Sequence, residues 1–264
     1  MNALLKKTLR WAGWFGFDPI TLVGNARGVA ALFREYRELK RQARNHRIPF
    51  PISSFYPCMA DRYAGAGTTS NHYFWQDLFV AQKIANARPQ RHVDVGSRID
   101  GFVAHVASFR EVEVIDIRAM PDSIPNVRFR QADMMRLDPA LAGTTDSLSC
   151  LHALEHFGLG RYGDPIDFEG YEKGFRSLCD LLRSEGTLYF SVPIGPQRIE
   201  FNAHRVFSIA HLLKLFGARF SVRSFSYVDD RGVLHEDVEL TPKIVSSNAD
   251  CLFGCGIFEL RKLC

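Results

Sequence analysis

The sequence predicts an α/β protein with a mostly parallel sheet that helices cover on both faces. From residue 92 onward, short apolar segments alternate with helical patterns, which is the order of elements in parallel sheets with crossover helices. Three acids, Asp94, Asp116 and Asp133, fall at the carboxyl ends of the first three expected strands, where open α/β sheets bind ligands. Two long apolar segments end the chain without a helix between them, which indicates a terminal antiparallel pair.

The individual elements follow from periodicity and from turn residues. Residues 3–16 and 21–45 carry apolar positions among Lys and Arg and predict two helices. Residues 46–70 are rich in Pro, Ser and Gly and predict irregular chain. Further helices are expected over residues 72–87, 99–109, 170–183 and 204–217. The expected strands cover residues 92–95, 112–117, 126–133, 146–151, 186–193, 219–228 and 251–262.

Composition narrows the class of protein. A chain of 264 residues with 46% apolar and 23% charged residues is ordinary for a folded protein, which excludes disorder throughout. There is no apolar run of the roughly 18 residues that a membrane-spanning helix needs, and the first residues lack the pattern of a signal peptide. We therefore expect a cytoplasmic protein with a basic helical extension and linker over residues 1–70 and an α/β domain over residues 71–264.

The positive charge is concentrated in the extension. Residues 1–47 hold ten Lys or Arg against three Asp or Glu, a balance of +7, so that the remainder of this +4 chain carries −3. Because the basic residues are concentrated in the extension and not on the domain, we do not expect a nucleic-acid partner. Because Trp11, Trp14 and Phe15 accompany these charges, we expect peripheral contact with the inner face of a membrane; alternatively, the apolar stripe from Val29 to Ala43 packs on the domain. No pattern indicates an oligomeric state.

The six cysteines follow no disulfide or metal-binding pattern. Cys251 and Cys255 are the nearest pair, but they lie in an apolar segment that predicts a strand. Buried free thiols are the favoured interpretation, ahead of a metal or disulfide role.

The loop after the first expected strand, Asp94 to Gly101, has the features of a cofactor loop. Gly96 permits a tight turn, and Gly101 lets the next helix lie close to the sheet. Asp116 follows at the spacing of an acid that accepts hydrogen bonds from ribose hydroxyls, and Asp133 is placed for an adenine amino group. For any one of these acids, a role in a turn or a helix cap is the alternative.

These segments resemble the successive motifs of class I S-adenosylmethionine-dependent methyltransferases. The resemblance covers about residues 90–264 and is carried by HVDVGSRIDG, VEVIDIR, VRFRQAD, DSLSCLHALEHF and LLRSEGTLYFSVP. It implies a Rossmann-like sheet of seven strands in the order 3-2-1-4-5-7-6, with strand 7 antiparallel, and S-adenosylmethionine as the cofactor. It also implies contacts to the methionine part, the ribose and the adenine of that cofactor from Asp94, Gly96, Ser97, Gly101, Asp116, Asp133 and Met134.

A second resemblance bears on the acceptor. HYFWQDLFVAQKI, HVDVGSRIDGFVAHV and HFGLGRYGDPID together resemble an uncharacterised bacterial domain family often encoded among genes for surface polysaccharides. That association implies O-methylation of a sugar or glycolipid hydroxyl, with a small-molecule or glycan acceptor as the partner. The alternative is a non-catalytic binding or scaffold protein that keeps the fold.

The candidate catalytic residues come just after the fourth strand. His152, Glu155 and His156 have the spacing i, i+3, i+4 and would share one face if this stretch were helical. A methyl transfer to a hydroxyl needs alignment and removal of a proton, so His156 is the expected general base, with Glu155 and Asp164 beside it.

A metal ion is the competing interpretation of the same residues. Methyltransferases with E-x-x-E-H at this position bind a divalent metal, and the resemblance implies a ligand set of His152, Glu155, His156 and His204. Several imidazoles with one carboxylate favour a zinc-like ion over Mg²⁺. A metal site, a metal-free base and a purely structural role remain open at this point.

Overall fold

The computed structural model describes residues 19–44, 52, 54–58, 67, 69, 71–120 and 122–263. The chain divides into two compact units, residues 1–68 and residues 69–264. The helix expected over residues 3–16 lies outside the described residues. Among the helices that are described, none has the length and apolar character needed to span a bilayer.

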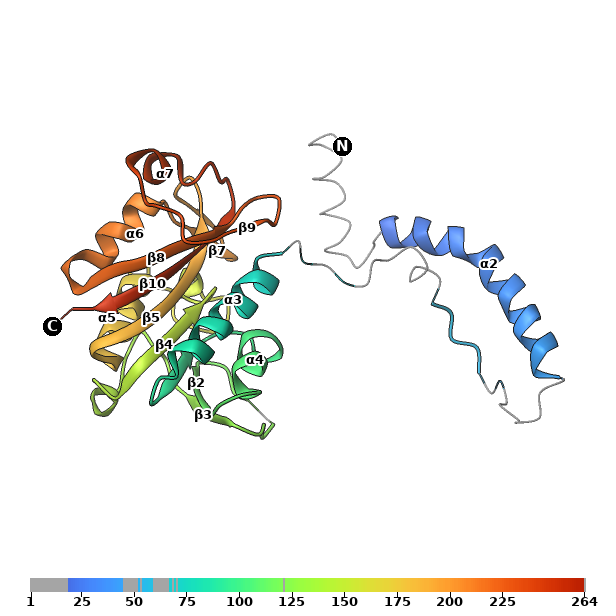
Figure 1. Ribbon diagram of the computed structural model, residues 1–264, viewed down its shortest axis with the longest axis horizontal. Coiled ribbons are helices and arrows are strands. Elements are labelled where there is room, and N and C mark those ends of the chain that lie inside the picture. Colours follow the sequence, from blue (N-terminus) through green and yellow to red (C-terminus); the bar gives the residue numbers. More distant parts are fainter. Residues whose placement is uncertain are drawn as a thin grey trace. The chain divides into compact units, whose positions relative to one another are not determined.

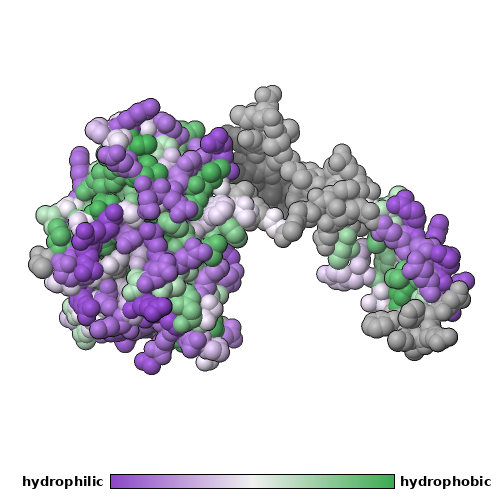
Figure 2. Space-filling model, viewed as in Figure 1, coloured by the Kyte–Doolittle hydropathy of each residue, from purple (hydrophilic) through white to green (hydrophobic). Residues whose placement is uncertain are grey.

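The described helix of the first unit is α2, Pro19–Ala43, close to the range expected from the sequence. Figure 2 shows hydrophilic residues along one side of this helix and hydrophobic residues beside them. Phe33 stacks on Phe55 at 6.1 Å between ring centroids, and Tyr36 meets the same ring edge-on at 5.4 Å. Part of the apolar stripe therefore packs within its own unit, and membrane contact through residues 1–47 stays a prediction.

The second unit is built on one eight-stranded sheet in the order β3-β2-β1-β4-β5-β10-β8-β9 (Figure 1). The first five strands in that order are parallel, and β10 runs antiparallel to both β5 and β8. A separate antiparallel hairpin pairs β6 with β7. The strands are β1 (His92–Val95), β2 (Val112–Asp116), β3 (Val127–Gln131), β4 (Thr145–Leu151), β5 (Leu182–Ile194), β6 (Arg198–Glu200), β7 (His204–Val206), β8 (Phe220–Val228), β9 (Leu234–His235) and β10 (Gly254–Lys262).

The predicted strand order is confirmed, with β8 and β10 as the sixth and seventh strands of the motif. The sheet has one more strand than expected, because the chain turns back after β8 and adds β9 at the edge. Asp229 holds this turn, since its carboxylate accepts hydrogen bonds from the backbone amides of Arg231 and Val233.

Two predicted helices differ from the structure. The helix expected over residues 204–217 begins only at Ile209, where the Ser208 side chain caps it, because His204–Val206 forms β7 instead. The segment 99–109 forms a π-helical turn, Ile99–Val103, followed by the short helix α4. The helical segments of this unit are α3 (His72–Ala87), α4 (Ala104–Ala107), α5 (Gly170–Leu181), α6 (Ile209–Phe216), α7 (Pro242–Ser247) and the short turns Pro139–Leu141, Leu154–His156 and Gly217–Arg219.

Each face of the sheet has its own hydrophobic core, because successive strand residues point to opposite faces. In β10, Ile257 packs with α3 and α4, whereas Phe258 packs with α5 and α6. The second core contains a cluster of aromatic rings in which Phe258 lies 5.1 Å from Phe216 and 4.8 Å from Phe225. Because helices cover both faces of the sheet, a ligand-binding site is expected at the ends of the strands.

The aromatic cluster gives a stability prediction. Phe258→Ala removes a ring with no exposed surface, and we expect the free energy of unfolding to fall by about 3–5 kcal/mol because the close-packed neighbours cannot fill the cavity. Urea denaturation measures the change. The control is Phe109→Ala, because the Phe109 side chain is 45% exposed and its loss should cost less than about 1 kcal/mol. Equal losses in the two variants would contradict the packing argument.

Candidate cofactor site

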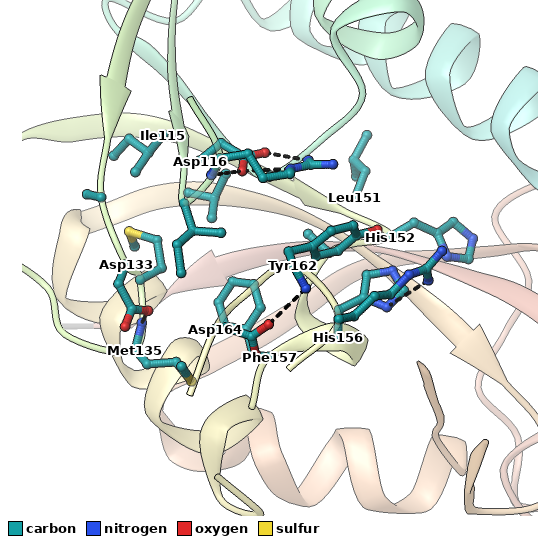
Figure 3. A pocket seen from close by; sticks show the side chains of 18 of the residues that line it. Ile115, Asp116, Asp133, Met135, Leu151, His152, His156, Phe157, Tyr162 and Asp164 are labelled. Carbon is teal, nitrogen blue, oxygen red and sulfur yellow. Dashed lines mark hydrogen bonds and ion pairs between the residues drawn. The ribbon is translucent and has the colours of Figure 1, made fainter. Parts of the chain in front are cut away.

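A cavity of about 280 Å³ opens at the carboxyl ends of the parallel strands (Figure 3). Asp116 and Asp133 lie on one side of it, and His152 and His156 lie opposite. These side chains come from three neighbouring parts of the sheet edge: the end of β2, the chain after β3 and the chain after β4. Its remaining lining comes from Tyr73, Val95, Gly96, Arg98, Ile115, Ile117, Arg118, Ala132, Met134, Met135, Leu151, Ala153, Phe157, Arg161, Tyr162 and Asp164.

Asp94 fixes the loop that borders this cavity. Its carboxylate has no exposed surface and accepts hydrogen bonds from the hydroxyls of Ser97 and Ser149 and from the backbone amide of Ser97. Burial raises the pKa of Asp94 to about 6, although the hydrogen bonds from Ser149 and Ser97 act to lower it. The carboxyl group therefore ties the loop after β1 to the neighbouring strand β4.

Gly96 is required by the turn that follows. Its φ of +72° lies in the left-handed region, and a Cβ at this position would approach the Cβ of Ala153 to 2.9 Å. A side chain here would therefore be strained and would also crowd the turn after β4. Gly96 thus lines the cavity without a side chain.

Asp116 is the last residue of β2, as its expected role requires. In this structure its two carboxylate oxygens accept hydrogen bonds from Arg118, which also lies over the ring of Tyr162 at 4.4 Å from the ring centroid. Arg118 and Tyr162 are lining residues that the sequence analysis did not single out. A ribose that binds Asp116 must compete with Arg118 for these oxygens.

The remaining predicted cofactor residues divide into two groups. Met134 lines the cavity beside Asp133, whose carboxylate accepts a hydrogen bond from the backbone amide of Met135. Asp94, Ser97 and Gly101 do not line the cavity. At Gly101 an added Cβ would meet Oδ2 of Asp77 at 2.5 Å, so this glycine makes room for a carboxylate from α3.

The chain after β4 does not form the regular helix that would place all three candidate catalytic residues on one face. It forms a single turn over Leu154–His156, and His152 has a left-handed φ of +50°. The side chains nevertheless meet: His152 Nδ1 lies 2.7 Å from Glu155 Oε1, and His156 Nε2 lies 3.7 Å from the same oxygen. Burial disfavours the charged form of His152, but the neighbouring Cys255 and Glu155 outweigh it and raise its pKa.

His156 is held as a neutral imidazole. Its Nδ1 donates a hydrogen bond to the carbonyl oxygen of Ala203 at 2.7 Å, which leaves Nε2 unprotonated. Burial lowers the pKa of His156, and Arg161 lowers it further, against the opposing effect of Glu155. At neutral pH this side chain can therefore accept a proton from a group in the cavity.

Asp164 lies in the loop beside the cavity, but its oxygens are already engaged. Oδ2 accepts hydrogen bonds from the backbone amides of Gly158 and Gly160, and Oδ1 accepts one from Tyr162. The carboxylate holds this loop in shape and carries Tyr162 over the cavity.

The four residues expected to hold a metal do not come together as one group. Among the described residues, the group of three or more potential ligands whose atoms lie within 4.8 Å of one another contains His152 but not Glu155, His156 or His204. Oε1 of Glu155 lies 2.7 Å from His152 Nδ1, and its Oε2 is buried without a hydrogen-bond partner. His204 is turned elsewhere: its Nε2 lies 3.5 Å from Glu200, and its ring lies 5.0 Å from that of Phe253.

Comparisons with known proteins agree with this architecture. Residues 106–249, more than half of the chain, match the model of the family described as "Caenorhabditis protein of unknown function, DUF268". No curated protein matches the chain in sequence.

Among solved structures, a geranyl diphosphate methyltransferase in complex with SAM is 13% identical, with a TM-score of 0.51 and coverage of 71% of this chain and 84% of that one. The [4+2]-cyclase SpnF is 15% identical, with a TM-score of 0.52 and coverage of 75% and 86%. A Burkholderia thailandensis 1,6-didemethyltoxoflavin-N1-methyltransferase with bound S-adenosylhomocysteine is 20% identical, with a TM-score of 0.49 and coverage of 71% and 79%. The fold is therefore that of class I methyltransferases. Since one of these similar proteins is a cyclase, the fold alone does not fix the reaction.

The buried carboxyl group of Asp94 gives a prediction of pH-dependent stability. Because its folded-state pKa of about 6 lies above the unfolded value, the native state keeps a proton that the unfolded state loses, and the free energy of unfolding falls as the pH rises through about 6. Asp94→Asn cannot titrate. We expect its stability relative to the unmodified protein to rise by about 3 kcal/mol between about pH 4 and pH 7.5.

Urea denaturation of both proteins across this pH range measures the difference. Only the change with pH matters, since the amide also alters the hydrogen bonds to Ser97. Parallel pH profiles for the two proteins would show that Asp94 does not titrate in this window.

Proposed function

This chain belongs to the DUF268 family, and from that premise and its methyltransferase fold we propose that it is an S-adenosylmethionine-dependent methyltransferase. The observation that supports the proposal best is the cavity at the strand ends, where Gly96, Asp116 and Asp133 line one continuous surface. A nucleoside needs acceptors for its ribose hydroxyls and for its amino group, and two carboxylates at adjacent strand ends supply them.

The residues present fit such a cofactor. The exposed backbone at Gly96, where a Cβ would collide with Ala153, suits the close approach of a bound molecule. Asp116 would hold the ribose, and Asp133 with Met134 would border the adenine. When bound, S-adenosylmethionine supplies an activated methyl group on a sulfonium sulfur.

The acceptor side of the cavity is the side of His156. A hydroxyl acceptor must lose its proton during methyl transfer, and a neutral imidazole anchored through its other nitrogen is suited to remove it. Glu155 Oε1, 3.7 Å from Nε2, stabilises the imidazolium that forms. Tyr162, whose ring meets that of His156 edge-on at 5.5 Å, helps to exclude water.

We propose a sugar or glycolipid hydroxyl as the acceptor, in the synthesis of a surface polysaccharide. Two features support this acceptor. A hydroxyl needs a base, which His156 can provide, and the sequence resembles a family encoded among surface-polysaccharide genes. The alternative function, a non-catalytic binding protein, would keep the cofactor contacts but would not depend on His156.

Cofactor binding is tested first. In Asp116→Ala we expect the affinity for S-adenosylhomocysteine to fall by about 1–3 kcal/mol, because the ribose hydroxyls lose the carboxylate that accepts their hydrogen bonds. Isothermal titration calorimetry measures it. Glu111→Ala is the matched control, since Glu111 is an exposed acid just before the other end of β2 and should leave affinity unchanged. An unaltered affinity in Asp116→Ala would remove this residue from the site.

Catalysis is tested at His156. His156→Ala should lower turnover by at least about 100-fold while S-adenosylhomocysteine binds as before, because the base acts on the acceptor. Formation of S-adenosylhomocysteine with a panel of methyl glycosides and short-chain glycolipids is the assay, and His235→Ala on β9 is the control. A protein that binds cofactor but methylates none of them would favour the scaffold alternative.

The same residue sets the pH dependence. Because the base must be neutral and its pKa is lowered, kcat/KM should be constant near neutral pH and should fall only below a midpoint under 6.5. A midpoint above 6.5 would mean that His156 is not the titrating base.

A further inference from the structure

Three potential metal ligands from distant parts of the chain meet beside the cavity. His72 is the first residue of α3, His152 follows β4, and Cys255 lies near the start of β10. One ligand atom from each side chain lies within 4.8 Å of the other two. His152 and Cys255 are buried, and His72 is partly buried.

His152 is oriented as a metal ligand. Its Nδ1 is hydrogen-bonded to Glu155 Oε1 at 2.7 Å, whereas its Nε2 is buried and has no hydrogen-bond partner. When one ring nitrogen of a histidine binds a metal, the other usually donates a hydrogen bond to a carboxylate or a carbonyl in this way. The left-handed backbone of His152, unfavourable for a residue with a Cβ, is the kind of local strain that proteins keep at functional positions.

The other two side chains complete the group. The ring of His72 stacks on that of His152, with 5.5 Å between centroids and an interplanar angle of 10°. The Cys255 side chain is fully buried, and its thiol donates a long hydrogen bond of 3.6 Å to Gln76 Oε1. Gln76 Oε1 also accepts a hydrogen bond from the hydroxyl of Ser191, so it keeps a partner when Cys255 is deprotonated.

We infer that His72, His152 and Cys255 bind a Zn²⁺ ion. Two imidazoles and a thiolate are donors that Zn²⁺ prefers, whereas Mg²⁺ and Ca²⁺ prefer oxygen ligands. In a tetrahedral zinc site the ligand atoms lie roughly 3.3–3.6 Å apart, which follows from Zn–N and Zn–S bonds of about 2.1 and 2.3 Å. Because the rings of His72 and His152 are nearly parallel, one of the two side chains must rotate for both to direct a nitrogen at a common ion.

The site differs from a structural zinc site because it has three protein ligands. Three ligands leave a fourth position for water or a substrate atom. His152 belongs both to this group and to the lining of the cofactor cavity, so the ion would be held by a residue of that lining. The inference concerns binding of the ion and does not depend on methyl transfer.

A different use of the same residues is a Cys–His–Glu hydrolytic triad. The side chain of Cys255 has no exposed surface, so a substrate carbonyl cannot reach its sulfur. On β10 and buried beside Gln76 of α3, this sulfur is closed to a molecule of that size.

Metal titration tests the site without any assay of activity. The full-length protein, freed of metal by dialysis against a chelator, is titrated with Zn²⁺ in competition with a chromophoric chelator, and with Co²⁺ followed by absorption. We expect about one ion per chain and a thiolate-to-Co²⁺ charge-transfer band in the near ultraviolet. Cys255→Ala should lose that band and bind Zn²⁺ at least about 100-fold more weakly, more than the loss typical for a residue outside the coordination sphere.

Matched variants separate this site from adventitious binding. Cys251→Ala removes a buried cysteine four positions away that is not in the group, and it should keep both the band and the affinity. His72→Ala, at the first residue of α3, should lose affinity like Cys255→Ala. A folded protein that binds neither ion, or in which Cys251→Ala and Cys255→Ala behave alike, would overturn the inference.

Discussion

A carboxyl group that has no exposed surface organises the edge of the sheet on which the site depends. Burying Asp94 is costly unless its oxygens are hydrogen-bonded, and the partners come from two separate segments: Ser97 in the loop after β1 and Ser149 on β4. The hydrogen bonds to the Asp94 carboxylate therefore also fix the loop, and the loop places Gly96 against the turn after β4. The part of the cavity wall at Gly96 therefore depends on hydrogen bonds made by a residue that does not line the cavity.

The fold was predictable because the core strands are short apolar runs bounded by turn residues, and their order followed from the motif resemblance. The elements that the sequence did not reveal are very short. β6, β7 and β9 are two or three residues long, too short for an alternation of apolar and polar residues to distinguish them from loop. His204 illustrates the cost: expected on a helix, it lies on β7 and points towards Glu200 and Phe253.

The site was predictable only in outline. Acids at strand ends could be found from spacing, but the direction of each side chain could not. Asp94 turned out to support the loop, whereas Asp116, at the end of β2, reaches the cavity. The role of Arg118 could not be predicted from the sequence. Its partner Asp116 is only two residues away, and either residue alone looks like an ordinary surface charge. Cys255 looked like a buried thiol, since its meeting with His72 depends on β10 lying in the middle of the sheet.

Glu155 connects the two proposals physically. Its Oε1 accepts a hydrogen bond from His152 Nδ1 and lies 3.7 Å from His156 Nε2. A single buried carboxylate therefore faces both the zinc-binding imidazole and the candidate base. Zn²⁺ binding would require a neutral His152 imidazole and a Cys255 thiolate. The hydrogen bond between His152 Nδ1 and Glu155 would stay in place, because the ion would take the other ring nitrogen. The same carboxylate would then orient the metal ligand and face the candidate base.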